Sequence, residues 1–170
     1  MNIYDELYEN IAINYGGLKT RKGEATDREK KIYSKVMNFL NNYGANQNSR
    51  VLEIGCALGF NHDCHVNYLG IEYSKIAVEQ AQKRFSSANI KQDDASDLSF
   101  SDSEFDFIFS ISVLEHIPKI EQALSEIDRV LRKGGLAYLA PAWNCRIWTV
   151  QKLDFLNYGE LSLFIEPYRK

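Results

Sequence analysis

The chain has 170 residues, of which 45% are hydrophobic and 12% aromatic, enough for the core of one compact domain. A net charge of -3 and the lack of a broad basic run argue against a nucleic-acid partner. No apolar run approaches the roughly 20 residues of a membrane helix, and the polar N-terminus does not resemble a signal peptide. The three cysteines lack a framework spacing, so we expect a cytoplasmic protein.

The first part of the chain predicts two helices. Residues 1–25 are rich in tyrosine and irregular, with a short helix expected over residues 3–11. Thr26 and Glu29 form a capping box, in which the hydroxyl and the carboxylate satisfy free backbone amides at a helix start. Apolar residues then recur at helical spacing as far as Gly44, where the helix ends.

A short apolar segment followed by a turn with two glycines is the centre of the pattern. Residues 51–54 predict a buried strand, and Gly55 and Gly59 flank the turn. Glycine lets the backbone adopt positive φ and approach a ligand closely. A hydrophobic strand that leads into such a turn is typical of a nucleotide site.

Strands and helices alternate along the following residues. Strands are predicted over residues 69–73, 89–92, 105–112 and 136–140, and helices over residues 74–85 and from Pro118 to Gly134-Gly135. This alternation predicts an α/β fold, a doubly wound and mostly parallel sheet flanked by helices. Residues 143–170 allow at most one more helix and one strand, so we expect a shortened C-terminal part.

Five segments resemble, in order, the motifs of class I S-adenosylmethionine-dependent methyltransferases, and most closely those of the small-molecule type 11 group. They are VLEIGCALG (51–59), GIEYS (70–74), DASDL (94–98), FDFIFSISVLEHI (105–117) and RVLRKGG (129–135). The resemblance covers roughly residues 50–142 and implies a Rossmann-like fold with S-adenosylmethionine as the cofactor. Two departures are Ala57, which replaces the usual middle glycine, and a C-terminal part too short for the family's last two strands.

The resemblance also implies roles for individual residues. Glu72, at the end of the second strand, would accept both ribose hydroxyls, and Tyr73 would pack against the adenine. Asp94 would accept the adenine amino proton, with Asp93 as the neighbour that could take its place. The other expected cofactor-binding residues are Glu53, Gly55, Cys56, Ala57, Gly59, Ala95, Ser110 and Ile111.

The acceptor side has candidates with open alternatives. His116 could be a general base, because an imidazole titrates near neutral pH, but a capping or packing role would also explain it. Tyr8, Tyr15 and Trp143 are candidate substrate-side residues, with ordinary packing as the alternative.

No metal site is expected. His62, Cys64 and His65 lie too close together for the spacing of a zinc finger, and the sequence has no second cluster of such residues.

One domain is expected, with residues 1–25 as a lid or loop segment, 26–142 as the cofactor-binding core and 143–170 as a substrate-side or interface segment. We predict direct in-line methyl transfer to a small-molecule acceptor, for which the protein mainly orients the reactants and excludes water. Missing strands would expose a sheet edge, which a homodimer or a partner could cover.

Three alternatives stay open. The first is a weak or inactive cofactor-binding module that acts with a partner, and the second is a fragment of a longer methyltransferase. The third, a nicotinamide-dependent dehydrogenase, requires a G-x-G-x-x-G spacing that the turn between Gly55 and Gly59 lacks.

Overall fold

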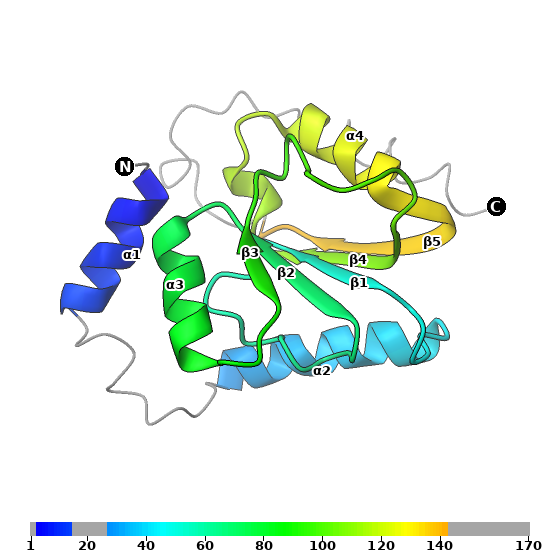
Figure 1. Cartoon of the computed structure of the whole chain (residues 1–170), viewed down its shortest axis with the longest axis horizontal. Helices are drawn as coiled ribbons and strands as arrows, with labels where there is room; N and C mark the ends of the chain where they lie inside the picture. The colour runs from blue at the N-terminus through cyan, green and yellow to red at the C-terminus, as the bar shows by residue number, and fades with distance from the viewer. Residues whose placement is uncertain (1–2, 15–26, 143–170) are drawn as a thin grey trace.

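The computed structural model describes residues 3–14 and 27–142, which form a parallel sheet between helices (Figure 1). The elements are α1 (Ile3–Asn14), α2 (Asp27–Asn42), β1 (Val51–Ile54), β2 (Tyr68–Glu72), α3 (Lys75–Arg84), β3 (Ile90–Gln92), β4 (Phe105–Ile111), the short 3-10 helix η2 (Leu114–His116), α4 (Ile120–Val130) and β5 (Leu131–Ala140). The predicted short C-terminal part lies outside the described residues. Within the described ranges, no helix has both the length and the apolar character needed to cross a bilayer.

The five strands form one sheet in the order β3-β2-β1-β4-β5, and every neighbouring pair is parallel. All four residues of β1 are buried, as expected for a central parallel strand covered on both faces. The chain runs outward from β1 to β3 and then returns to the other side of β1 as β4. Such a switch point leaves a crevice at the carboxyl ends of the strands. The predicted doubly wound α/β fold is confirmed.

Helices cover both faces of the sheet, with α2 and α4 on opposite sides (Figure 1). Val51 belongs to the core under α2 and α3, whereas the next residue, Leu52, belongs to the core under α4. Val36 of α2 and Val130 of α4 are fully buried in these two clusters. The alternation follows from the two-residue period of a strand, which turns successive side chains to opposite faces.

The boundary between α4 and β5 differs from the prediction. The helix ends at Val130 and the strand begins at Leu131, before the Gly134-Gly135 pair that was expected to end the helix. Leu131 pairs with Phe105, and the register against β4 then shifts. Gly134 adopts a φ of +79° in this irregular stretch, so the glycine pair allows a bulge in the strand.

Candidate functional site

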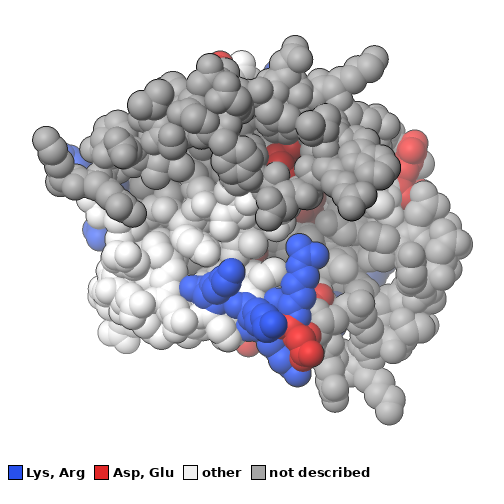
Figure 2. Space-filling model, turned by 180° about the vertical axis from the view of Figure 1, so that it is seen from behind, with Lys and Arg blue, Asp and Glu red and all other residues white. Residues whose placement is uncertain are grey.

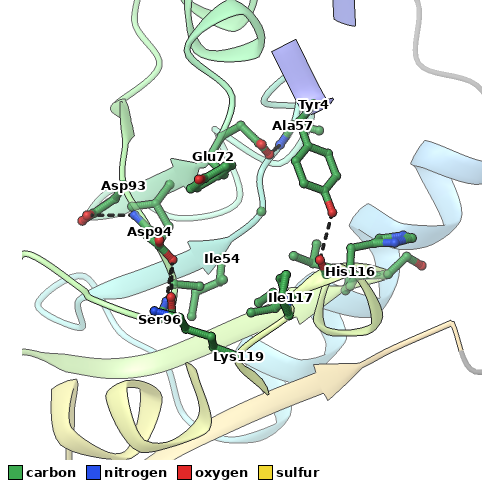
Figure 3. A pocket seen from close by; sticks show the side chains of 18 of the residues that line it. Tyr4, Ile54, Ala57, Glu72, Asp93, Asp94, Ser96, His116, Ile117 and Lys119 are labelled. Carbon is green, nitrogen blue, oxygen red and sulfur yellow. Dashed lines mark hydrogen bonds between the residues drawn. The ribbon is translucent and has the colours of Figure 1, made fainter. Parts of the chain in front are cut away.

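A cavity of about 770 Å³ lies at the carboxyl edge of the sheet (Figure 3). Its size is within the range of small-molecule sites, and its place is the crevice expected at the switch point. The predicted site residues that line it are Tyr8, Gly55, Ala57, Glu72, Tyr73, Asp94, Ala95, Ile111 and His116. Tyr15 and Trp143 lie outside the described residues.

Glu72 joins two turns at the centre of the cavity. Its Oε2 accepts the backbone N–H of Ala57 at 3.0 Å, and its Oε1 accepts the backbone N–H of Ser74 at 3.1 Å. Burial raises the pKa of the Glu72 carboxyl, and the backbone hydrogen bonds oppose this rise. A carboxylate oxygen has two lone pairs, so each oxygen can still accept a hydroxyl of a ligand.

The turn after β1 is held in left-handed conformations. The N–H groups of Gly55 and Cys56 both donate to the carbonyl oxygen of Ile71, at 2.8 and 2.9 Å. Gly55 has a φ of +75°, and a Cβ there would lie 2.3 Å from Val113 Cγ2, so a side chain does not fit. Ala57 has a φ of +47°, although it carries a Cβ. The residue that replaces the family's middle glycine therefore keeps a glycine-like backbone.

Replacing Ala57 by glycine is expected to raise the free energy of unfolding by about 0.5–1 kcal/mol. A left-handed backbone costs an alanine about 1–2 kcal/mol in the folded state, and the glycine variant would be free of this cost. Glycine also has more conformational freedom in the unfolded chain, which offsets roughly half of the gain. Urea unfolding measures the difference. The control is Ala77→Gly in α3, where the same replacement should cost about 1 kcal/mol or more. A comparable loss in both variants would contradict the strain at Ala57.

The loop after β3 brings a carboxylate to one end of the cavity. Asp94 Oδ1 accepts the N–H and the hydroxyl of Ser96 at 2.8 and 2.7 Å, and Asp94 points toward Ser96 in Figure 3. Asp94 Oδ2 has no hydrogen bond to another described residue, whereas Asp93 Oδ2 accepts the hydroxyl of Ser99 at 2.8 Å. Tyr73, 46% exposed, presents its ring nearby. Asp94 is thus better placed than Asp93 to accept a hydrogen bond from a ligand.

Helix α1 borders the cavity and is attached to the rest of the domain at two points. The Tyr4 hydroxyl donates to the backbone carbonyl of His116 at 2.9 Å, and the Ser74 hydroxyl donates to Asp5 Oδ1 at 2.7 Å. Tyr8, one turn further along α1, also lines the cavity, and burial raises the pKa of its hydroxyl well above the usual range. This helix can therefore shield a bound ligand from water.

His116 faces the cavity from the short helix after β4. Its side chain is 42% exposed, and its Nε2 lies 3.9 Å from Glu115 Oε1. Glu115 is buried, and the same oxygen accepts the N–H of Ala142 at 3.0 Å. His116 is thus placed to contact a ligand that enters the cavity, and its role as a general base stays a prediction.

The Glu53 carboxylate lies inside the protein and does not line the cavity. It accepts hydrogen bonds from the Asn61 side-chain amide and the Tyr68 hydroxyl. Burial raises the pKa of Glu53 to about 7, although both hydrogen bonds oppose the rise. Its placement gives it a role in holding β1 to its surroundings, and its contact with a cofactor stays a prediction.

Three other predicted cofactor residues also lie away from the cavity lining. The Cys56 side chain is buried in the core under α2 and α3. A Cβ on Gly59 would lie 2.5 Å from Ile90 Cδ1, so this glycine permits close packing of the turn against β3. The buried Ser110 hydroxyl donates to the Ile54 carbonyl at 3.1 Å. The presence of each of these three residues is explained by packing or hydrogen bonding within the protein, without a ligand.

Several residues line the cavity that the sequence pattern did not indicate, among them Tyr4, Arg28, Ser96, Ser112 and Lys119. Ser96 and Ser112 follow predicted site residues within two positions, so proximity to a strand end was an available signal. Tyr4 and Arg28 come from helices far away in the sequence, and no local pattern could place them there.

The doubly wound sheet, the left-handed turn after β1 and the acid at the end of β2 define a Rossmann-like, nucleoside-binding class of domain. The family model Methyltransf_11, described as "Methyltransferase domain", matches residues 52–139, more than half of the chain. The chain belongs to this family of class I S-adenosylmethionine-dependent methyltransferases, and S-adenosylmethionine is the cofactor that family and fold imply.

Named relatives agree with this membership. The chain is 34% identical over 104 residues to O-methyltransferase rstn1 of Aspergillus nomiae, with 54% of the chain and 45% of that protein covered. It is 28% identical over 142 residues to demethylmenaquinone methyltransferase of Staphylococcus carnosus, with 78% of the chain and 57% of that protein covered. The chain thus spans about half the length of these curated relatives.

Solved structures share the fold. The PH0226 protein of Pyrococcus horikoshii has a TM-score of 0.60 at 21% identity, covering 82% of this chain and 65% of that one. A putative S-adenosyl-L-methionine-dependent methyltransferase of Methanococcus maripaludis has a TM-score of 0.56 at 23% identity, covering 65% of this chain and 57% of that one. At these identities the likeness extends to the fold alone.

Proposed function

We propose that this chain binds S-adenosylmethionine in the cavity at the end of β1 and β2 and transfers its methyl group to a small-molecule acceptor. The observation that carries the proposal is the Glu72 carboxylate, whose two oxygens anchor two turns and retain lone pairs toward the cavity. These lone pairs suit the two ribose hydroxyls, and Asp94 Oδ2 suits the adenine amino group. A cavity of about 770 Å³ has room for the cofactor and a small acceptor.

The bound cofactor supplies a methyl group on a positively charged sulfur, which leaves as a neutral thioether. Glu72 and Asp94 would hold the nucleoside, and the turn from Gly55 to Gly59 would lie against the methionine part. Tyr4 and Tyr8 of α1 would exclude water from the reacting atoms. These contacts contribute by aligning the acceptor with the methyl group.

His116 is the proposed general base for an acceptor whose nucleophile must lose a proton. It reaches the cavity beside Tyr4, on the β4 side where an acceptor can approach the turn after β1. A hydroxyl or a protonated amine would need this proton transfer, whereas a nucleophile that is already deprotonated would not.

Calorimetric titration of the purified full chain with S-adenosylmethionine and S-adenosylhomocysteine tests the cofactor site, with micromolar binding of both expected. Conversion of S-adenosylmethionine to S-adenosylhomocysteine in the presence of an acceptor panel tests the transfer. Absence of binding would overturn the proposal. Binding without any turnover would favour the alternative of a cofactor-binding module.

Two expectations about the whole protein stay predictions, namely a cytoplasmic location and a homodimer or partner that covers the sheet edge. Within the described residues, β5 forms one edge of the sheet and several of its side chains are exposed. An edge strand with unpaired backbone groups is a place where a second chain can add.

A further inference from the structure

The cavity is lined by groups of both charges. Asp93 and Asp94 follow β3, whereas His116 follows β4, three strand spacings away in the sheet. Neighbouring strands lie about 4.8 Å apart, so these strand ends are about 14 Å apart. Arg28, in the first turn of α2, also lines the cavity. The lining thus combines these carboxylates with two cations, which are Arg28 and Lys119, and Lys119 lies beside Ser96 in Figure 3.

Arg28 differs from the other described arginines in its partners. Arg50, Arg129 and Arg132 each form an ion pair, and the Arg84 guanidinium lies 4.3 Å from the centre of an aromatic ring. Arg28 lines the cavity and has no ion pair with any residue of the described ranges. An exposed, permanently charged guanidinium on a ligand cavity suits a carboxylate, which it can bind through two parallel hydrogen bonds.

The charge around Arg28 would also favour an anion. The same helix continues with the exposed residues Lys30, Lys31 and Lys35. Together with Arg28 they give this part of α2 four positive charges, against two negative charges from Asp27 and Glu29. On the face shown in Figure 2, several Lys and Arg side chains lie side by side, with acidic side chains among them. A local excess of positive charge raises the concentration of anions near the mouth of a cavity.

We propose that Arg28 is a carboxylate-binding residue of the cavity, an inference that rests on the proposed methyltransferase function. The carboxylate has two possible sources, which are the methionine part of the cofactor and an acceptor that is itself an organic acid. Tyr4 and Tyr8 line the cavity with Arg28, so their rings offer apolar surface for the body of an acidic acceptor.

Calorimetry with two thioethers tests the first source without any acceptor. S-adenosylhomocysteine carries the amino-acid carboxylate, and 5′-methylthioadenosine has the same nucleoside without it. If Arg28 binds the cofactor, Arg28→Gln weakens S-adenosylhomocysteine binding about 10- to 100-fold and leaves methylthioadenosine binding unchanged. Arg28→Lys should retain part of the affinity. Lys133→Gln, which removes an exposed cation of β5 outside the cavity lining, is the matched control and should change neither affinity.

Matched acceptors test the second source. Methyl transfer to the phenol hydroxyls of 4-hydroxybenzoate and 4-hydroxyphenylacetate is compared with transfer to those of their amides, in wild type and Arg28→Gln. If Arg28 binds the acceptor, the acids are preferred and the variant raises their KM at least tenfold, with unchanged S-adenosylhomocysteine affinity. The inference is overturned if the wild type binds S-adenosylhomocysteine and Arg28→Gln changes neither its affinity nor the KM of any acid. Absence of cofactor binding by the wild type would instead overturn the proposed function.

Discussion

Replacing Glu72 by alanine is expected to weaken binding of S-adenosylhomocysteine at least 100-fold. The carboxylate is 8% exposed and receives the N–H groups of Ala57 and Ser74, so its removal frees both turns that border the nucleoside. It also removes the proposed acceptors for two ribose hydroxyls. A hydrogen bond to a charged group contributes about 1.5–3 kcal/mol, so two of them account for a loss of this size. Isothermal calorimetry gives the affinity directly.

Two further variants make this experiment specific. Glu79→Ala removes an exposed carboxylate from α3 and should leave the affinity unchanged. Glu72→Gln keeps an acceptor oxygen but no charge, and its affinity should lie between those of the wild type and Glu72→Ala. Unfolding curves establish that each variant is folded. Wild-type affinity in folded Glu72→Ala would remove Glu72 from the proposed site.

The stability of the protein is expected to fall as the pH rises from about 4.5 to 7, because of Glu53. Burial raises the pKa of this carboxyl in the folded state to about 7, compared with 4.5 for the exposed group. The folded state thus binds the proton more tightly than the unfolded chain. The resulting stabilisation is fully present below pH 4.5 and is lost as the pH rises through 7. This difference between the folded and unfolded pKa values corresponds to about 3 kcal/mol in the free energy of unfolding.

Denaturant unfolding at pH values from 4.5 to 8 measures this dependence, and Glu53→Gln isolates the contribution of one group. Glutamine still accepts the Tyr68 hydroxyl, and its amide can donate to Asn61 Oδ1 once the Asn61 side-chain amide turns over, because Asn61 Nδ2 is the atom that faces Glu53 in the wild type. The variant should be as stable as the wild type at low pH and more stable at pH 8. Glu79→Gln is the control and should keep the wild-type slope. An unchanged slope in Glu53→Gln would show that another group titrates.

Much of the fold was predictable because its signals are local. Residues 51–54 and 105–111 are apolar runs that only a sheet covered on both faces can bury, and Ser74 caps α3 as predicted. The irregular start of β5 was not predictable, because the bulge at Gly134 exists only through the register that β4 imposes. In the sequence alone, the glycine pair has the pattern of a helix end.

Some residues of the candidate site were likewise predictable from local sequence signals, and others were not. Gly55 directly follows β1 and Glu72 is the last residue of β2, so the predicted strands carry both to the carboxyl edge. Glu53 shows the limit of this reasoning. It lies on the turn's own strand, but the two-residue period of β1 points it toward Tyr68 in the core under α2 and α3, not toward the cavity.

The sequence by itself determined the sheet, the glycine turn and the acid after the second strand, since each depends on residues a few positions apart. Only the tertiary structure decided that Tyr4 and Arg28 line one cavity together with His116. These residues come from helices whose positions depend on which faces they bury against the sheet and against each other. That choice is a property of long-range packing, which no short stretch of sequence encodes.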